Sequence, residues 1–506
     1  MANAESNQNK HIDTAFIGHP KPLFSLSMTE VWERFSYYGI RPLLVLFMAA
    51  AIFDGGLGIP RESASAIVGI FGGCVYLATL PGGWLADNYL GQKKAVLYGA
   101  VIMAFGHLAI ALSYFTQIAF FLGLSLIVIG SGLFKTCASV MVGMLYKDGD
   151  SRRDSGFTIF YMGINIGAFV APLLCGLAQK EVGWHLGFGV GGIGMLISLV
   201  IFYFKTLKDF DEFDKKVGFE HSIEAAKRHK FALPLIYGFV IIFLAIFGLV
   251  ASGLLTINPV SLSKNMILII AIASGIYFCY LYFLCGLSVA EKKNLILLAI
   301  LYLAAAFFWS AFEQQPTSFN LFALDFTDRV FFGYEIPAAW AQSLNPLFII
   351  TFAPLMSALW IYLARKGLEL SSITKFTLGI IGAGVGFGIM IFASKAVLAS
   401  GQSVSMWWIV ASMWFLTMGE LCLSPVGLSI MTKLAPSVIR SQIMALWFIS
   451  SALGNVIAGL IGGGVHADNI EALPDLFAQC AIVLFIVAGV MFGIKFVMGR
   501  LARDKK

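Results

Sequence analysis

The stretch Glu30-Val31-Trp32-Glu33-Arg34-Phe35-Ser36-Tyr37-Tyr38-Gly39-Ile40-Arg41 runs directly into an apolar segment and carries four charged side chains. On a helix of about 3.6 residues per turn, these four charges gather on one side. Each charge inside a bilayer costs roughly 2.5 to 3.5 kcal/mol on insertion scales, so such a cluster persists only where it faces a polar interior. The stretch therefore predicts a membrane helix that borders a transport site.

The composition of the whole chain supports a membrane protein. Hydrophobic residues make up 59% and charged residues 12% of the 506 residues, and the mean hydropathy is +0.85. An ordinary soluble domain has roughly 25% charged residues, so a water-soluble core is excluded. Windows of roughly 20 apolar residues recur along the chain, each enough to cross the hydrocarbon layer. About fourteen spans are predicted, beginning near residues 28, 65, 95, 118, 157, 184, 232, 266, 294, 342, 376, 404, 437 and 474.

The arrangement of these spans predicts an all-α polytopic fold with two halves. The seventh and eighth spans, Ala232 to Ser252 and Met266 to Gly286, contain no charged residue, and without them six helices precede and six follow. Six plus six is the count of a two-half transporter with a site at the midplane. The alternative, in which the pair belongs to the core bundle, stays open. The predicted domains are an N-terminal tail at 1–25, a six-helix bundle at 26–205, a linker at 206–231, two inserted transmembrane helices at 232–290, a second six-helix bundle at 291–500 and a C-terminal tail at 501–506.

Lysine and arginine predict the orientation, because positive residues in short loops stay on the cytoplasmic side. One face collects Lys93, Lys94, Lys147, Arg152, Arg153, Lys292, Lys293, Arg365, Lys366, Lys433, Arg440, Arg500 and Arg503, and the other shows mainly Arg61, Lys180, Lys264, Arg329 and Lys395. The bias predicts that both termini are cytoplasmic and accounts for the net charge of +6 without a nucleic-acid partner. The seven cysteines show no metal-ligand spacing, so neither a metal site nor a disulfide framework is expected.

Charged residues in other spans extend the predicted site. Four carboxylates, Glu30, Glu33, Glu313 and Glu420, stand against three cations, Arg34, Arg41 and Lys135. An unpaired carboxylate in a low-dielectric cavity takes up a proton more readily than one in water, which is the physical requirement for proton coupling.

The two halves differ in the sign of these charges. Arg34, Arg41 and Lys135 belong to the first half, where a guanidinium suits a bidentate grip on a carboxylate. Glu313 and Glu420 belong to the second half, where a carboxylate suits an ammonium group. A zwitterionic substrate that bridges the halves fits this pattern. The alternative is that all seven charges form internal salt bridges that hold the bundle together.

Several motifs carry a family resemblance. Residues 30–39 resemble the E-x-x-E-R-F-x-Y-Y-G motif of the proton-dependent oligopeptide transporter (POT) family, of the bacterial type, within the major facilitator superfamily. Residues 160–167 are similar to its F-Y-x-x-I-N-x-G signature. Further matches are Glu313-Gln314 after Phe308-Trp309, Ser343-Leu344-Asn345-Pro346, and Gly419-Glu420-Leu421 with Ser424-Pro425-Val426-Gly427-Leu428. The resemblance covers nearly the whole chain and implies the major facilitator fold, with twelve core helices and two extra ones.

The resemblance also implies roles for matching residues. Arg41 and Lys135 would meet the carboxylate of the peptide. Asn165 and Asn345 would meet its backbone or amino end, and Glu420 would meet its ammonium group. The further substrate-binding residues implied are Tyr37, Tyr38, Tyr76, Trp309, Ser424 and Trp447. Glu30 and Glu33, with Arg34 beside them, resemble the family's proton-linked group, and Glu313 would pair with Arg41 in a gate that protonation releases.

Two further stretches of the sequence bear on this resemblance. Gly83 to Asp87, followed by Gly91 to Lys94, resembles the superfamily loop between the second and third helices, where Asp87 is expected to form a conformational latch by capping or pairing across helices. After Lys135 the family often has Pro-Asn, whereas this chain has Thr136-Cys137. The kink expected at that proline is therefore absent or supplied by nearby glycines.

The function implied is proton-coupled symport of di- and tripeptides into the cytoplasm by alternating access, in a bacterial inner membrane. The expected partners are short peptides, protons and the lipid bilayer, the protein is expected to be a monomer, and no cofactor is expected beyond protons as the coupling ion. A carrier of another small solute, such as an amino acid, nitrate or a drug, is the alternative on the same scaffold. A receptor that binds without transport also stays open. An enzyme is disfavoured because no nucleophile with its base occurs at depth.

Overall fold

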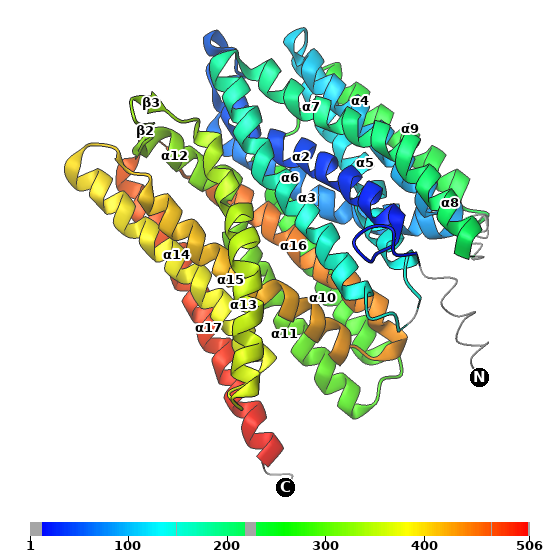
Figure 1. Ribbon diagram of the computed structural model, residues 1–506. Helices are drawn as coiled ribbons and strands as arrows, with labels where there is room; N and C mark the ends of the chain where they lie inside the picture. Colours follow the sequence, from blue (N-terminus) through cyan, green and yellow to red (C-terminus); the bar gives the residue numbers. More distant parts are fainter. Residues whose placement is uncertain (1–12, 148, 218–228, 467, 504–506) are drawn as a thin grey trace, which may run out of the picture. The chain divides into compact units, whose positions relative to one another are not determined.

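The computed structural model describes residues 13–147, 149–217, 229–466 and 468–503, and helices dominate them (Figure 1). Parts of the predicted tails and linker, at 1–12, 218–228 and 504–506, lie outside the described residues. The helices are α2 (Lys21–Ala49), α3 (Arg61–Leu85), α4 (Gln92–Ala111), α5 (Gln117–Met144), α6 (Arg153–Glu181), α7 (Trp184–Ile201), α8 (Leu207–Val217), α9 (Ala232–Ala251), α10 (Pro259–Leu284), α11 (Val289–Phe312), α12 (Asn320–Phe326), α13 (Leu344–Arg365), α14 (Ser372–Ser400), α15 (Trp407–Leu434), α16 (Arg440–Gly462) and α17 (Leu473–Arg503).

The predicted set of membrane helices is confirmed. Within the described parts of the chain, 13 helical segments are long and apolar enough to cross a membrane. Helix α2 has 29 residues, about 43 Å at 1.5 Å per residue, so it is also long enough to span a membrane. The starts agree with the pattern to within several residues: α9 begins at Ala232 as predicted, whereas α2 begins at Lys21 and not near residue 28. The chain is an all-α polytopic membrane protein.

Contacts between described residues divide the chain into two compact units. Unit 1 comprises residues 1–43 and 77–257, and unit 2 comprises residues 44–76 and 258–506. The division therefore passes through α2 and α3, and it places α9 in unit 1 and α10 in unit 2. The domain boundaries drawn from the sequence stay a prediction.

In unit 1, α4 and α5 approach each other closely through glycines. A Cβ atom on Gly99 would lie 2.6 Å from the carbonyl oxygen of Gly130, and a Cβ on Gly130 would lie 2.6 Å from that of Gly99. Such small residues let membrane helices pack backbone against backbone. Next to this contact lies a buried apolar cluster that includes Phe134, Met141 and Phe202.

The stretch predicted as a linker begins as the amphipathic helix α8. Lys93, in the first turn of α4, lies 2.9 Å from Asp211 and 3.1 Å from Asp214 of α8. Lys21, the first residue of α2, lies 3.1 Å from Asp209 and 2.8 Å from Glu212. Of the residues in these ion pairs, Asp209 is buried, whereas Lys21 and Glu212 are exposed. Together the ion pairs hold α8 against the ends of two helices of unit 1.

Residues 13–20, predicted as part of the N-terminal tail, are tied to the connection between α5 and α6. His19 Nδ1 lies 2.8 Å from the Tyr146 hydroxyl, and Arg152 Nη1 donates to the carbonyl oxygens of Asp13 (3.1 Å) and Gly18 (2.9 Å). Hydrogen bonds from Arg152 also lower the pKa of the Asp150 carboxyl. Burial raises the pKa of the Tyr146 phenol to about 12. Residues 13–20 are therefore a folded part of unit 1.

In unit 2, the start of α3 is joined to other helices by charge. The Arg61 guanidinium forms an ion pair with Asp325 of α12, and Glu62 lies 3.0 Å from His466 after α16. Four two-residue strands occur in the described chain: β1 (Thr327–Asp328) pairs parallel with β4 (Val404–Ser405), and β2 (Val330–Phe331) pairs antiparallel with β3 (Tyr334–Glu335). These contacts fix the end of α12, the short helix that follows the break in α11.

Candidate functional site

The charged cluster of α2 is fully buried. Arg34 Nε lies 2.9 Å from Glu30 Oε1 and 2.5 Å from Glu33 Oε2, and all three residues are at most 3% exposed. Among the described residues, Glu30 Oε2, Glu33 Oε1 and Arg34 Nη2 have no hydrogen-bond partner. One guanidinium therefore serves two carboxylates whose polar atoms are not all satisfied. Burying such a cluster costs free energy unless a proton or another positive charge neutralises the second carboxylate.

Lys135 of α5 adds a second positive charge to this cluster. Its charge interacts favourably with both Glu30 and Glu33. On the other side, the Arg34 guanidinium lies 5.8 Å from the Tyr37 ring centre, and the Tyr37 ring meets that of Tyr38 edge to face. The structure thus brings together in unit 1 two of the three predicted cations, the two glutamates predicted to carry protons, and two predicted tyrosines.

Helix α6 contributes Asn165 close to α2. At Gly167 a Cβ atom would run into the α2 backbone at Val31, so this glycine permits the close approach that positions Asn165. Asn165 is 4% exposed, and its amide donates to the carbonyl oxygen of Tyr161 at 2.9 Å. The amide is therefore held by its own helix, and its role in substrate binding stays a prediction.

In unit 2, two predicted residues meet directly. Asn345 of α13 donates from Nδ2 to Glu420 Oε2 of α15 at 3.0 Å. The same nitrogen lies 3.0 Å from the Thr417 hydroxyl, which in turn donates to the carbonyl oxygen of Met413 at 2.8 Å. Asn345 thus connects the two helices and fixes one oxygen of the carboxylate.

Glu313 stands at the end of α11, where the helix breaks. The residue caps α11 after Phe312, and a wide turn containing Pro316 leads on to α12. Glu313 is 7% exposed, and its charge repels that of Glu420. Two predicted carboxylates of unit 2 therefore influence each other, and binding a cation or a proton would relieve this repulsion.

Trp309 and Trp447 lie against glycines. Trp309 is 8% exposed and packs edge to face with Phe308 and Phe312, while its indole nitrogen has no hydrogen-bond partner among the described residues. The Trp447 ring lies over Gly427 of α15, where even a Cβ atom would collide with it. Tyr76 in α3 and Ser424 in α15 are half-buried. The roles of these four residues in binding remain predictions.

Asp87 follows α3 and is exposed. Its Oδ1 accepts a hydrogen bond from Gln92 Nε2, at the first residue of α4, at 2.7 Å. The side chain thus bridges the ends of two consecutive helices, and its role as a latch stays a prediction. At the departure Thr136-Cys137, α5 continues as one helix without proline, and Cys137 is fully buried in the apolar cluster.

Two polar residues that the sequence interpretation did not single out belong to the site. Thr417 lies three residues before Glu420, on the same face of α15, which is the signal that could have found it. Gln314 is fully buried: it donates to the carbonyl oxygen of Ser310 at 3.0 Å and accepts from the Ser318 hydroxyl at 2.9 Å. Gln314 therefore joins the two sides of the break beside Glu313.

The fold and the buried charges indicate the general class of this protein. A polytopic helical bundle with buried charges of opposite sign in two units is built as a membrane carrier. Groups of three or more His, Cys, Asp or Glu side chains able to hold a metal ion are absent from the described residues. The chain matches the sequence profile of the POT family over residues 93–472, and it belongs to this family.

Relatives and solved structures extend over almost the whole chain. A protein named peptide transporter YePEPT from Yersinia enterocolitica is 53% identical over 479 residues, which are 94% of each chain. A di-/tripeptide transporter from Lactococcus lactis subsp. lactis is 34% identical over 496 residues, 96% of this chain and 95% of the relative. A peptide transporter POT solved with sulfate superposes with a TM-score of 0.85 at 37% identity, covering 97% of this chain and 98% of the other. A POT family transporter in complex with 5-aminolevulinic acid gives 0.82 at 30% identity, covering 96% and 98%. The protein is therefore a membrane transporter and not an enzyme.

Proposed function

We propose that this protein imports di- and tripeptides together with protons by alternating access between its two halves. The observation that carries the proposal is the separation of charge: unit 1 holds Arg34 and Lys135 at its carboxylate cluster, whereas unit 2 presents Glu420 on the Asn345 amide. A peptide is a zwitterion whose two charged ends need one partner of each sign. The printed names of the relatives, and the 5-aminolevulinic acid bound in one of the solved structures, support a small zwitterionic substrate.

The two ends of the peptide bind to side chains of opposite charge. We assign the peptide carboxylate to Arg41 and Lys135, since a guanidinium and an ammonium both donate charge-assisted hydrogen bonds. We assign the amino end to Glu420, whose Oε2 is held by Asn345 at 3.0 Å, so the carboxylate is oriented before the substrate arrives. Asn165 offers its carbonyl oxygen to the peptide backbone.

Proton coupling follows from the balance of charge at Arg34. Glu30 and Glu33 share one guanidinium, and Lys135 supplies the remaining positive charge. When the peptide carboxylate engages Lys135, one of the two glutamates loses that compensation, and a proton restores neutrality. In the second half, a proton on Glu313 would release a pairing with Arg41 and allow that gate to open.

The gradient supplies enough energy for accumulation. At a membrane potential of about 100 mV, each translocated charge contributes roughly 2.3 kcal/mol, equivalent to a concentration ratio of about fifty. We propose a bacterial inner-membrane location with both termini cytoplasmic, a monomer as the working unit, and protons in place of any other coupling ion or cofactor.

Competition for uptake tests the substrate class. Radiolabelled dialanine is offered to proteoliposomes with an excess of unlabelled dipeptide, tripeptide, alanine, nitrate or a cationic drug. The proposal expects inhibition by the di- and tripeptides alone. Inhibition by one of the other solutes in preference to peptides would support the alternative carrier, and saturable binding of dialanine without uptake would indicate a receptor.

A further inference from the structure

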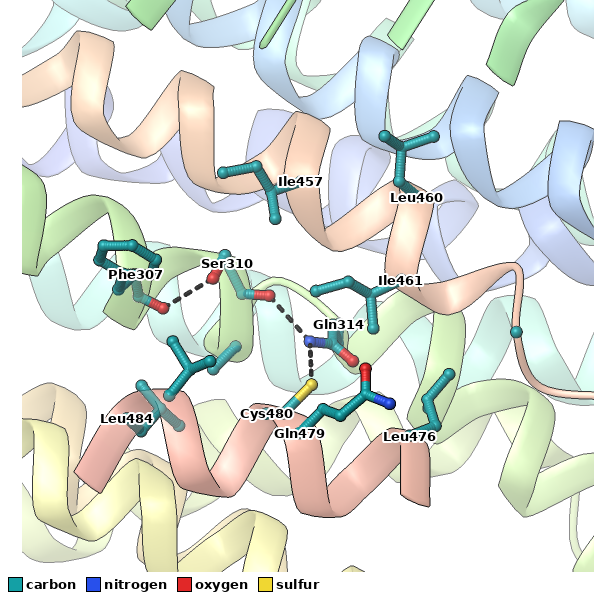
Figure 2. Close-up of a pocket in the computed structure, with 13 residues that line it drawn as sticks. Phe307, Ser310, Gln314, Ile457, Leu460, Ile461, Leu476, Gln479, Cys480 and Leu484 are labelled. Carbon is teal, nitrogen blue, oxygen red and sulfur yellow. Dashed lines mark hydrogen bonds between the residues drawn. The ribbon is translucent and has the colours of Figure 1, made fainter. Parts of the chain in front are cut away.

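A cavity of about 380 Å³ lies in unit 2 between α11, α16 and α17 (Figure 2). Its walls are mainly apolar, with Phe307, Ile457 and Leu484 as examples, and its polar groups come from Ser310, Gln314, Gln479 and Cys480. Among the described residues, those that line it include no charged side chain and none of the residues assigned to the peptide or the proton. Its volume is that of a small-molecule site. The cavity therefore differs in chemistry from the charged groups of the site already described, and it borders that site at Gln314.

The Gln314 amide at the wall has one well-satisfied and one poorly satisfied N–H group. Nε2 donates to the Ser310 carbonyl oxygen at 3.0 Å and to Cys480 Sγ at 3.5 Å, as Figure 2 shows. A thiol sulfur is a weak acceptor, so the second N–H gains little from this contact. A fully buried amide in this state favours any oxygen acceptor that reaches it.

Two exposed apolar side chains form the entrance of the cavity. Phe307 is 39% and Val483 40% exposed, and both line the cavity. On membrane-spanning helices such exposed apolar side chains suit contact with lipid, so an occupant can enter between them from the hydrocarbon layer. A charged or zwitterionic molecule would lose its hydration here without a counter-charge. The occupant is therefore neutral and supplied by the bilayer.

We propose that this cavity binds the acyl chain of a neutral lipid whose ester or hydroxyl oxygen accepts a hydrogen bond from Gln314 Nε2. The site has a direct link to the break in α11, because Gln314 follows Glu313 and connects Ser310 with Ser318 across the break. A lipid that engages Gln314 competes with the Cys480 contact and not with the two stronger bonds. A bound lipid therefore contacts the break after α11 through Gln314 and leaves the hydrogen bonds of Gln314 with Ser310 and Ser318 in place.

Photolabelling in nanodiscs tests the site. The probe is a monoacylglycerol with a diazirine in its acyl chain, and labelled peptides are mapped by mass spectrometry. The expected result is enrichment in residues 307–314, 457–464 and 476–484 over the lipid-exposed helix α9. Val483→Trp, at the entrance, is expected to reduce this labelling about tenfold. Ile482→Trp is the matched control: Ile482 is the neighbouring residue, is 57% exposed and does not line the cavity.

Three results would overturn the proposal. Labelling of the three segments no denser than that of α9 would show general lipid contact only. Equal loss of labelling in the Val483 and Ile482 variants would show that the cavity entrance is not the route. Equal labelling by an alkane probe that carries the same diazirine but no oxygen would refute the hydrogen bond to Gln314. Both substitutions add bulk on an exposed face of α17, so an unchanged melting temperature establishes that each variant is folded.

Discussion

Replacement of Glu420 by glutamine separates recognition of the peptide amino group from the architecture that surrounds it. A glutamine keeps the size of the side chain, and its carbonyl oxygen can still accept from Asn345 Nδ2, now 3.0 Å from Glu420 Oε2. The contact between Asn345 and Thr417 is not touched. The negative charge alone is removed, so the loss should fall on substrates that bring an ammonium group.

The size of the effect follows from the kind of bond that is lost. A hydrogen bond to a charged group contributes about 1.5 to 3 kcal/mol, and each 1.4 kcal/mol is a factor of ten. Glu420→Gln should therefore weaken the binding of dialanine roughly tenfold to hundredfold. N-acetyl-dialanine, which has no ammonium group, should change by less than about threefold because it never made this bond.

Counterflow exchange in proteoliposomes gives the affinities without a proton gradient. Concentrations that halve the exchange of labelled dialanine are measured for both compounds with the native protein, Glu420→Gln and Glu369→Gln. Glu369 is an exposed residue between α13 and α14 and serves as the matched control. An equal loss for dialanine and its acetylated form would mean that Glu420 acts through structure, and no loss for dialanine would remove it from the amino-end site.

Three further substitutions test packing, positioning and pH. Gly82→Ala should destabilise the protein by about 1 to 3 kcal/mol, because the added Cβ would collide with a carbonyl group of α5. Gly83→Ala is the control: its Cβ would make only an ordinary contact, so the stability should not change. The melting temperatures of the two variants in detergent are compared. Thr417→Val removes a hydroxyl partner of the amide that holds Glu420 and should weaken dialanine binding by about 0.5 to 1.5 kcal/mol, while Thr351→Val, whose hydroxyl bonds only to its own helix, should leave the exchange unchanged. The Asp150 carboxyl has a lowered pKa because a guanidinium donates to it, so its contribution is present above the usual aspartate pKa of about 3.9 and is lost as pH falls through the lowered value. At neutral pH, Asp150→Asn should speed hydrogen exchange of residues 13–20, and an unchanged exchange rate would refute the tie between these segments.

The sequence predicted the membrane helices well because a bilayer fixes both their length and their composition. Ala232 was predicted as the start of a span, and α9 begins there; residues 30–41 were predicted as a charged membrane helix, and they lie within α2. The first part of the predicted linker proved helical, because its apolar and acidic residues alternate at helical spacing and Lys21 and Lys93 lie opposite the acidic ones. Helical periodicity is local, so it can be read without knowledge of the packing.

The partners within the site were less accessible to the sequence. Spacing placed Glu30, Glu33 and Arg34 on one side of a helix, but it could not show that a single Nε lies 2.9 Å and 2.5 Å from the two carboxylates. The contact of Asn345 with both Glu420 and Thr417 joins residues that are 75 and 72 positions apart. Such pairs depend on how two helices cross, which composition and periodicity do not determine. The roles given to Tyr76, Ser424 and Trp447 rest on motif resemblance and remain to be tested.

The division of α2 and α3 between the two units could not be predicted from the sequence. The first turns of α3 join unit 2 through Arg61 and Glu62, although the helix pattern alone assigns all of α3 to the first bundle. Ion pairs at the ends of helices are set by which loops meet, and one sequence does not show this.

Dialanine uptake into proteoliposomes, with and without an inward proton gradient, tests the central claim most directly when native protein and Glu33→Gln are compared. The account predicts that the gradient drives accumulation in the native protein, and that Glu33→Gln loses this accumulation but retains exchange of dialanine across the membrane. Glu62→Gln, a substitution of an exposed glutamate at the start of α3, provides a control that keeps gradient-driven uptake. Accumulation by the native protein that ignores the gradient, or gradient-driven uptake that persists in Glu33→Gln, would contradict the account.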